Sequence, residues 1–342
     1  MLIRSFTTSV VALSFLFLLA CIIIDNSHSF STTRSSRFSS VISTTAERVR
    51  ATTVLNMAGD NDDAKYSMPD QVKRFENAKE TNNERFLDIS TVYDGGELSG
   101  KRILVTGGNR GLGYEIVKEA VENGATVIVL SRSTNDELEG LVGKWNVYSG
   151  VDVTDNVAVD AALKRIKSDG GELDYVINNA GYFYEPNEKI LDASLNFDEQ
   201  LKQINICALG PLRVNAAAVN AKALADDAKL AIITSQAGSC EWRKTQNKDE
   251  GGDYGHHMSR AACNIAGVLQ AEELRKKGYS VVLIHPGFNR TEMTAKYKEI
   301  WDEEGAVMPN IGAKRVLYEA MKSSIETTGS FVNAEDGLQI PW

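Results

Sequence analysis

The chain has 342 residues, which is long enough for two average domains or for one large α/β domain with extensions. Apolar residues make up 43% and charged residues 24%, so the chain can bury a sizeable core and is not globally disordered. The net charge of −9 is unevenly distributed along the chain. Residues 1–57 hold five arginines against Asp25 and Glu47, a net charge of +3, so the remaining residues carry a net charge of −12. An acidic body argues against a general nucleic-acid binder, which needs clustered Lys and Arg for phosphate contacts.

The N-terminus carries the pattern of a targeting sequence. An apolar run of 15 residues, 10–24, follows Arg4 and suits a signal-peptide core, whereas a bilayer span needs about 20 residues. Ser27 and Ser29 supply a cleavage site, so residues 1–29 are predicted to be a signal peptide. Residues 30–57 are rich in Ser, Thr and Arg, as in a transit peptide.

The tandem of signal and transit segments, with Phe30 at the junction, resembles the bipartite presequence of algae whose plastids lie inside extra membranes. The resemblance implies a plastid protein with no membrane attachment in its mature form. The alternatives are the secretory pathway or an uncleaved signal anchor followed by a stem.

Residues 58–97 are polar, and Val72, Phe75 and Ala78 have helical spacing within 69–86. We expect this segment to be a surface extension that leads into the domain and carries no chemistry. Four cysteines lie far apart and form no Cys-x-x-Cys pair, which predicts reduced, mostly buried thiols. They are Cys21, Cys207, Cys240 and Cys263.

A dinucleotide-binding loop begins after a short apolar strand at residues 103–105. The segment from Thr106 to Gly113 reads TGGNRGLG, and a predicted helix at 114–122 follows it. Gly107 permits a tight turn, Gly111 lets the backbone approach a pyrophosphate, and Gly113 lets helix and strand pack closely. The expected contacts are Gly107, Asn109, Arg110, Gly111, Leu112 and Gly113.

The end of the second predicted strand, 126–130, indicates which cofactor is bound. A NAD-binding unit places Asp or Glu here to hold the ribose 2′-hydroxyl, but this chain has Arg132, with Arg110 nearby in the loop. A guanidinium can pair with a 2′-phosphate, so the two arginines predict NADP(H) in preference to NAD(H).

Further motifs follow in order. A third predicted strand, 147–151, precedes Asp152-Val153-Thr154-Asp155, and a fourth, 175–177, precedes Asn178-Asn179-Ala180-Gly181. With the TGxxxGxG loop, these motifs resemble the short-chain dehydrogenase/reductase family over residues 98–342. The matches continue in Asn205 and in Ser235, at the end of a fifth predicted strand at 232–235. They continue further in Pro286, Gly287 and Thr291, which follow a sixth predicted strand at 281–284. The tail from residue 329 is similar to that of the C-factor and sniffer-like branch of the family.

The resemblance implies an α/β Rossmann-type fold: one doubly wound parallel sheet in three α/β/α layers, binding a small-molecule carbonyl or alcohol substrate. Further cofactor contacts would be Asp152, Val153, Asn179, Ala180, Gly181, Pro286, Gly287 and Thr291. Residues 288–310 would form a lid whose Met293, Tyr297, Trp301 and Met308 wall an apolar pocket, or else an amphipathic helix on the core. A homodimer through the helix at 256–277 is a further possibility.

The expected active site departs from the family pattern. Reduction in the family uses a Tyr proton donor, a Lys four residues later, a Ser that polarises the carbonyl and a relaying Asn. Ser235 and Asn205 match the last two, but His256 and Arg260 stand where Tyr and Lys are expected, and Tyr254 comes two residues too early. Imidazole titrates near pH 6.5, but the adjacent Arg260 disfavours its charged form.

Two hypotheses follow for the function. One is an NADP(H)-dependent oxidoreductase acting on a carbonyl or alcohol substrate, with a mechanism altered at His256 and Arg260 and with Tyr254 as an alternative donor. The other is a catalytically impaired NADP(H)-binding regulatory or scaffold protein. A metal site at His256, His257 and His285 is disfavoured, because adjacent histidines point to different helix faces.

Overall fold

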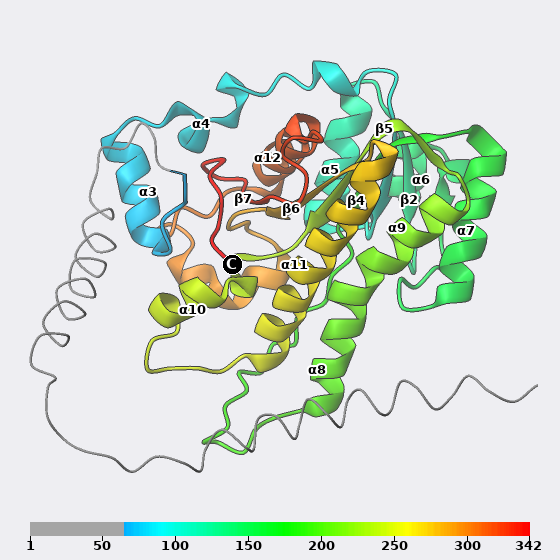
Figure 1. Cartoon of the computed structure of the whole chain (residues 1–342). Helices are drawn as coiled ribbons and strands as arrows, with labels where there is room; N and C mark the ends of the chain where they lie inside the picture. Colours follow the sequence, from blue (N-terminus) through cyan, green and yellow to red (C-terminus); the bar gives the residue numbers. More distant parts are fainter. Residues whose placement is uncertain (1–64) are drawn as a thin grey trace, which may run out of the picture. The chain divides into compact units, whose positions relative to one another are not determined.

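The computed structural model describes residues 65–342, which fold around one parallel sheet (Figure 1). In this part of the chain, seven strands lie in the order β3-β2-β1-β4-β5-β6-β7, and every neighbouring pair is parallel. The strands are β1 (Arg102–Thr106), β2 (Thr126–Leu130), β3 (Val147–Tyr148), β4 (Leu173–Asn178), β5 (Leu224–Ile233), β6 (Ser280–His285) and β7 (Phe331–Asn333). The order reverses between β1 and β4, so the expected doubly wound Rossmann-type fold is confirmed.

Helices cover both faces of the sheet. Because successive side chains of a strand point to opposite faces, Leu104 joins one core cluster while Ile103 and Val105 join the other. The first cluster packs against α7 (Asn156–Gly170), α9 (Gly210–Asn220) and α11 (Tyr254–Leu274), and the second against α5 (Gly111–Glu122), α6 (Asp136–Val142) and α12 (Pro309–Lys322). Burial on both faces explains why the strands are almost continuous apolar runs.

The remaining helical elements lie in the connections. They are α3 (Gln71–Glu80), α4 (Glu84–Leu87), η1 (Ile89–Thr91), η2 (Gly96–Leu98), η3 (Lys144–Asn146), α8 (Phe197–Ile204), η4 (Asn205–Leu209), η5 (Gln236–Gly238), α10 (Cys240–Gln246), η6 (Arg275–Lys277) and η7 (Glu292–Ile300). The predicted third strand is too long: β3 has two residues, because the chain turns at Gly150, where φ is +77°.

The segment before β1 is more deeply packed than the sequence suggested. A helix forms at α3 as expected, but its buried face consists of Gln71, Arg74 and Ala78. Ile89 and Leu98 lie in the same core cluster as β1. The expectation of a mere surface lead-in is therefore wrong for this part, because the domain buries apolar side chains such as Ile89 and Leu98 together with the polar Gln71 and Arg74.

Three cysteines lie in the described residues and all are free; Cys207 and Cys263 are buried as expected, but Cys240 is exposed. Within residues 65–342, no helix is both long and apolar enough to cross a membrane. The predicted targeting segments and Cys21 lie outside the described residues, so the proposed domain boundaries stay predictions.

Candidate active site

The residues singled out by sequence gather where the strands end. β1 leads into the glycine loop, β2 into Arg132, β4 into Asn179, β5 into Ser235 and β6 into Pro286. In a parallel sheet these carboxyl ends share one edge, and the edge next to the reversal of strand order is where ligands bind.

The glycine loop has the geometry that a dinucleotide needs. Gly107 has φ +67°, and a Cβ there would lie 3.0 Å from Ala180 Cα. A Cβ at Gly113 would lie 2.3 Å from the carbonyl oxygen of Gly107, so α5 packs directly on the turn. Gly111 also has a positive φ, +55°, but a Cβ there would meet nothing within 4 Å. The close contacts at Gly107 and Gly113 and the open space above Gly111 fit a pyrophosphate at the start of α5.

Asn179, at the end of β4, stabilises the glycine loop through hydrogen bonds. Its side-chain Nδ2 donates to the carbonyls of Thr106 and Gly107, at 3.1 and 3.2 Å. Its backbone N–H and that of Ala180 both donate to Thr106 Oγ1 at 3.0 Å. Asn179 therefore shapes the loop through its own hydrogen bonds, whatever contact it makes with the cofactor.

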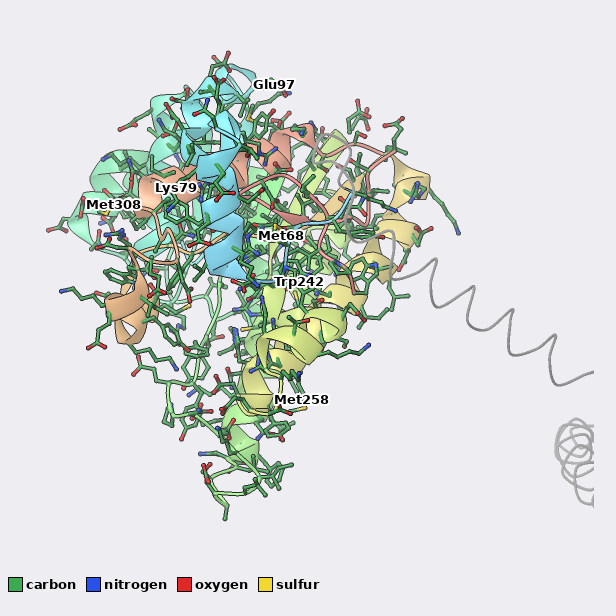
Figure 2. The ribbon with its side chains drawn as sticks, turned by 90° about the vertical axis from the view of Figure 1, so that its left-hand side faces the viewer. Met68, Lys79, Glu97, Trp242, Met258 and Met308 are labelled. Atoms are coloured by element: carbon green, nitrogen blue, oxygen red, sulfur yellow. The ribbon has the colours of Figure 1, made fainter. Side chains whose placement is uncertain are left out.

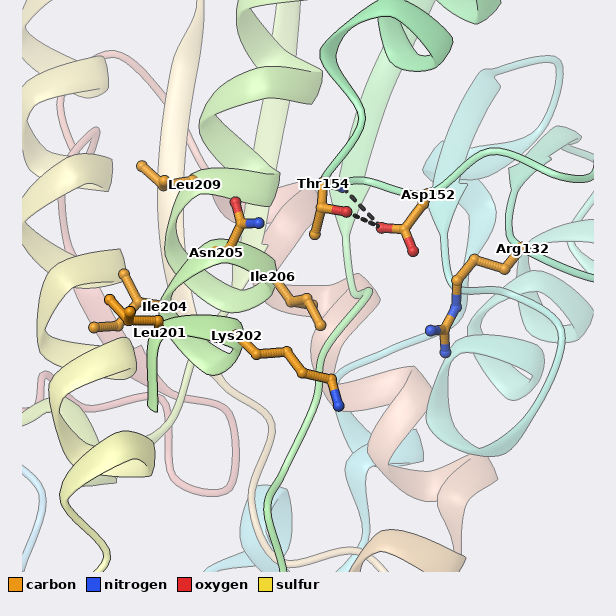
Figure 3. A pocket seen from close by; sticks show the side chains of 9 residues that line it. All are labelled: Arg132, Asp152, Thr154, Leu201, Lys202, Ile204, Asn205, Ile206 and Leu209. Atoms are coloured by element: carbon orange, nitrogen blue, oxygen red, sulfur yellow. Dashed lines mark hydrogen bonds between the residues drawn. The ribbon is translucent and has the colours of Figure 1, made fainter. Parts of the chain in front are cut away.

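A cavity of about 480 Å³ opens beside the ends of β2 and β3 (Figure 3). Asp152 Oδ1 accepts hydrogen bonds from the Thr154 backbone N–H and hydroxyl, at 2.8 and 2.7 Å, and Oδ2 has no hydrogen-bond partner among the described residues. Arg132 is exposed and forms no ion pair with any described residue. The lining residues are Arg132, Asp152, Thr154, Leu201, Lys202, Ile204, Asn205, Ile206 and Leu209.

The two arginines that were predicted to select NADP(H) are placed differently. Arg110 is exposed and pairs with Glu292 of η7 at 3.2 Å. Asn109 Nδ2 donates to Ser133 Oγ at 3.1 Å, which joins the glycine loop to the residue after Arg132. Only Arg132 faces the cavity.

Arg260 lies beneath the candidate reaction site. Its side chain is buried, its Nη1 donates to the carbonyl of Ile233 at 3.2 Å, and its Nε has no partner. A Cβ on Gly181 would lie 3.4 Å from Nη2. Gly238, in η5, lets α11 pack closely against this turn, because a Cβ on Gly238 would lie 2.8 Å from the Arg260 carbonyl oxygen. Arg260 thus spans the ends of β4 and β5, next to Ser235.

His256 lies one turn before Arg260 on α11. Its ring packs edge to face on Phe183, with centroids 4.8 Å apart, and its buried Nδ1 has no hydrogen-bond partner within residues 65–342. Burial and the nearby Arg260 cation hold the pKa of His256 well below its usual value, and His257, Arg243 and Lys296 lower it further. The imidazole is therefore neutral at neutral pH.

Three other candidates are oriented by local contacts. Ser235 Oγ accepts from the Ala237 N–H at 3.1 Å. Tyr254 begins α11, and a Cβ on Gly251 would lie 3.9 Å from its hydroxyl, in the loop before the helix. His257 Nδ1 lies 3.1 Å from the Ala237 carbonyl oxygen, so the His257 ring links α11 to η5.

Asn205 is directed away from this group. Its Oδ1 and carbonyl oxygen accept from Arg213, at 2.6 and 3.1 Å, and the residue lines the cavity of Figure 3. It stands at the start of η4, a π-helical turn between α8 and α9. No hydrogen bond joins its side chain to Ser235 or His256 within the described residues. The part predicted for Asn205 in a proton relay therefore stays a prediction.

The loop at 288–308 lies over the same edge. Lys296 Nζ donates to the Glu185 carbonyl at 2.9 Å and lies 4.3 Å from the Phe183 ring centroid, which joins η7 to the chain after β4. No residue of η7 is buried, so the alternative of an amphipathic helix on the core is wrong. Met293, Tyr297 and Met308 are exposed, and their role as pocket walls stays a prediction. Sequence patterns did not point to Phe183 or Lys296, because neither belongs to a motif.

Histidines are not clustered for metal binding in residues 65–342, which hold no group of three or more His, Cys, Asp or Glu suited to it. His285 lies at the end of β6, and in the part of the chain that the structure describes both of its buried ring nitrogens lack a hydrogen-bond partner. Burial lowers the pKa of His285 to about 3, which keeps it neutral.

Comparison with known proteins identifies the family. A family model described as short chain dehydrogenase matches residues 101–301. The chain belongs to the short-chain dehydrogenase family. A short-chain dehydrogenase of this kind is an NAD(P)-dependent oxidoreductase, and its fold binds a nicotinamide cofactor.

Its relatives within the short-chain dehydrogenases include a dehydrogenase and a protein named C-signal. A 1-hydroxy-2-glutathionyl-2-methyl-3-butene dehydrogenase of Rhodococcus sp. (strain AD45) is 31% identical over 242 residues, 70% of this chain and 99% of the relative. The C-signal protein of Myxococcus xanthus is 30% identical over 50% of this chain and 94% of its own length. The structure of NADPH-bound carbonyl reductase from chicken fatty liver is 25% identical, with a TM-score of 0.62, over 71% of this chain and 100% of that one.

Proposed function

We propose that this short-chain dehydrogenase is an NADP(H)-dependent carbonyl reductase in which His256 and Ser235 act on the substrate oxygen. The observation that carries the proposal is the position of His256 and Arg260, one turn apart on α11, with Arg260 spanning the strand ends below the glycine loop. An NADPH-bound carbonyl reductase shares the fold, which supports this substrate class. The tail resemblance and the C-signal relative support a place in the C-factor and sniffer-like branch.

In the proposed reaction, Ser235 and Arg260 have different roles. When bound, the nicotinamide cofactor supplies the hydride. Among the described residues, Ser235 Oγ accepts one hydrogen bond and donates none, so its O–H is available to donate to the carbonyl oxygen of a substrate. Arg260 Nη2 faces Gly181 at the end of β4, a position that suits a contact with ribose hydroxyls. Since Arg260 stays protonated, it cannot carry a proton onward as Lys does.

His256 controls when the substrate oxygen can be protonated. A neutral imidazole can donate a hydrogen bond to the carbonyl oxygen, whereas full proton transfer is easiest from the imidazolium. Because the pKa of His256 is depressed, the imidazolium becomes populated only in acid. The activity is therefore slow at neutral pH.

The test is NADPH oxidation with a broad panel of aldehydes and ketones. Turnover of at least one carbonyl is expected, and its kcat/KM should rise as the pH falls from about 8 to about 5, in the direction set by the lowered pKa of His256. NADPH binding measured in parallel shows that the site is intact. Binding without turnover at either pH would refute the reductase and favour the alternative of an NADP(H)-binding regulatory protein.

NADP preference is proposed from the position of Arg132 in the cavity. The Arg132→Ala variant should raise the Kd for NADPH about tenfold or more and change the Kd for NADH little. The reason is that NADPH carries a 2′-phosphate that can pair with the Arg132 guanidinium, whereas NADH has none. Arg110→Ala is the control, since Arg110 is already paired with Glu292 and should show a smaller effect. Equal losses for both cofactors on Arg132→Ala would contradict the proposal. Fluorescence titration of the unaltered protein and both variants measures the Kd values for NADPH and NADH.

For the N-terminal segment we propose plastid targeting by residues 1–57, supported by the order of the apolar and Ser/Thr/Arg-rich stretches. A fluorescent protein fused after residue 57 should enter the plastid of an alga whose plastids have extra membranes. The same fusion with Phe30→Ala should be diverted into the secretory pathway. Retention of the unaltered fusion at a membrane would instead support a signal anchor.

A further inference from the structure

The helix α3, which lies outside the residues matched by the family model, contacts the loop that covers the candidate site. Figure 2 shows α3 lying across this side of the molecule, with Met68 before it and Trp242 close by. The Arg74 guanidinium stacks over the Trp242 ring, 5.5 Å from its centroid. α3 is thus attached to the catalytic domain through a charged side chain that is itself buried.

A single carboxylate joins α3 to the start of the loop. Glu335 is fully buried, and its Oε2 accepts from Arg74 Nε at 3.1 Å. Its Oε1 accepts from the backbone N–H of Phe288 at 3.1 Å. Gln71 Nε2 lies 3.1 and 3.2 Å from the two oxygens. A Cβ on Gly287 would lie 2.6 Å from Glu335 Cγ, so the carboxylate sits tightly under the loop's first residues.

Glu335 is charged at all ordinary pH values. Burial alone would raise its pKa, but the Arg74 and then the Arg315 cation, helped by the hydrogen bond from the Phe288 N–H, lower it to about 2. A buried carboxylate needs a cation and hydrogen-bond donors to be stable. Arg74 and Gln71 supply both from α3, which makes the contact specific.

The same face of α3 holds the other end of the loop. Gln71 Nε2 donates to the Glu304 carbonyl at 3.2 Å. Gly305, with φ +69°, lies against Phe75, because a Cβ there would be 2.6 Å from the ring. Residues 71, 74 and 75 are neighbours on one helix face, so a single helix reaches both loop ends.

Arg74 also reaches the residue after Ser235. Its Nη2 lies 3.2 Å from Gln236 Oε1, at the start of η5. One guanidinium therefore connects α3, the start of the loop at 288–308 and the turn that carries the candidate catalytic serine.

We propose that Arg74 is a positioning residue, which holds the loop at residues 288–308 over the active site through Glu335. A loop fixed at both ends loses less conformational freedom when it closes on a substrate, so holding it favours substrate binding. The effect on substrate binding rests on the proposed reductase function. The effect on the loop itself does not.

The test measures backbone hydrogen exchange of the NADPH-bound protein by mass spectrometry. In Arg74→Met, exchange within residues 288–308 should be about tenfold faster or more, while the glycine loop keeps its protection. Gln71→Leu removes hydrogen bonds to Glu335 and Glu304 without leaving a charge unpaired, and should give a smaller change in the same direction. It keeps the proposal testable if Arg74→Met does not fold.

The matched control is Arg85→Met, which breaks an ion pair between the same extension and Glu319 of α12. It should lower the melting temperature without selectively raising exchange in 288–308. With a carbonyl substrate, Arg74→Met should raise KM several-fold with little change in kcat, and Arg74→Lys should restore part of the loss. Unchanged loop exchange in folded Arg74→Met and Gln71→Leu, or equal changes in Arg85→Met, would overturn the proposal. Faster loop exchange without any carbonyl turnover would uphold the positioning role and refute the reductase alone.

Discussion

The double variant His256→Tyr, Arg260→Lys should reduce carbonyl substrates about 100-fold faster than the unaltered protein at neutral pH. His256 is neutral there, because burial and the Arg260 cation lower its pKa. A phenol in its place carries its proton at neutral pH, and a lysine one turn later on α11 favours the phenolate that forms once the proton has moved. Ser235 is unchanged and can still donate to the carbonyl oxygen.

Steady-state NADPH oxidation measures this effect, and its pH profile identifies the donor. The increase towards acid expected for the unaltered protein should disappear in the double variant. His257→Tyr is the matched control, because His257 contacts Ala237 and should not serve as a donor. A double variant that binds NADPH yet reduces no faster than the unaltered protein would contradict the assignment of these two positions. An inert unaltered protein with an active double variant would favour the regulatory alternative.

The Gly113→Ala variant should lose NADPH affinity by more than about tenfold and lose about 1–3 kcal/mol of unfolding free energy. The added methyl would lie 2.3 Å from both the Gly107 carbonyl oxygen and Asn179 Nδ2. Neither atom can move freely, since Asn179 holds the loop through the carbonyls of Thr106 and Gly107. The methyl must therefore push α5 away from the turn that receives the pyrophosphate.

Fluorescence titration with NADPH and chemical denaturation measure the two losses. Gly140→Ala is the control, because Gly140 lies inside α6 and a Cβ there meets nothing within 4 Å. It should gain about 0.5–1 kcal/mol from the better helix propensity of alanine and leave NADPH binding unchanged. Wild-type NADPH affinity in Gly113→Ala would show that the loop tolerates a side chain and would refute this account of the glycine.

The fold was largely predictable, because its signals are local. β1, β2 and β6 are short apolar runs that end in glycine, polar or proline residues, and α5 follows its loop directly. The exception is β3, which Gly150 ends after two residues. The depth of α3 was missed, because its buried face is built from Gln71 and Arg74, and no hydrophobic period marks such a face.

The sequence predicted which residues follow the strand ends, but it did not predict how their side chains are oriented. Their roles in a functional site stay predictions. The spacing of four residues between His256 and Arg260 already indicated that the cation would lower the imidazole pKa. Asn205 has the expected position in the chain, yet it faces Arg213, which comes from the next helix. Arg110 pairs with Glu292, 182 residues further along, and its predicted contact with the cofactor stays a prediction.

By itself, the sequence determined the order of strands and helices along the chain and the glycine loop, because each depends on residues within a few positions of one another. The departure from the usual Tyr and Lys at His256 and Arg260 stays a prediction. Only the tertiary structure decided how deeply His256 is buried, where Asn205 and Arg110 point, and how Glu335 receives Arg74 from 261 residues away. Such contacts depend on which surfaces the packed sheet brings together, and no local pattern encodes them.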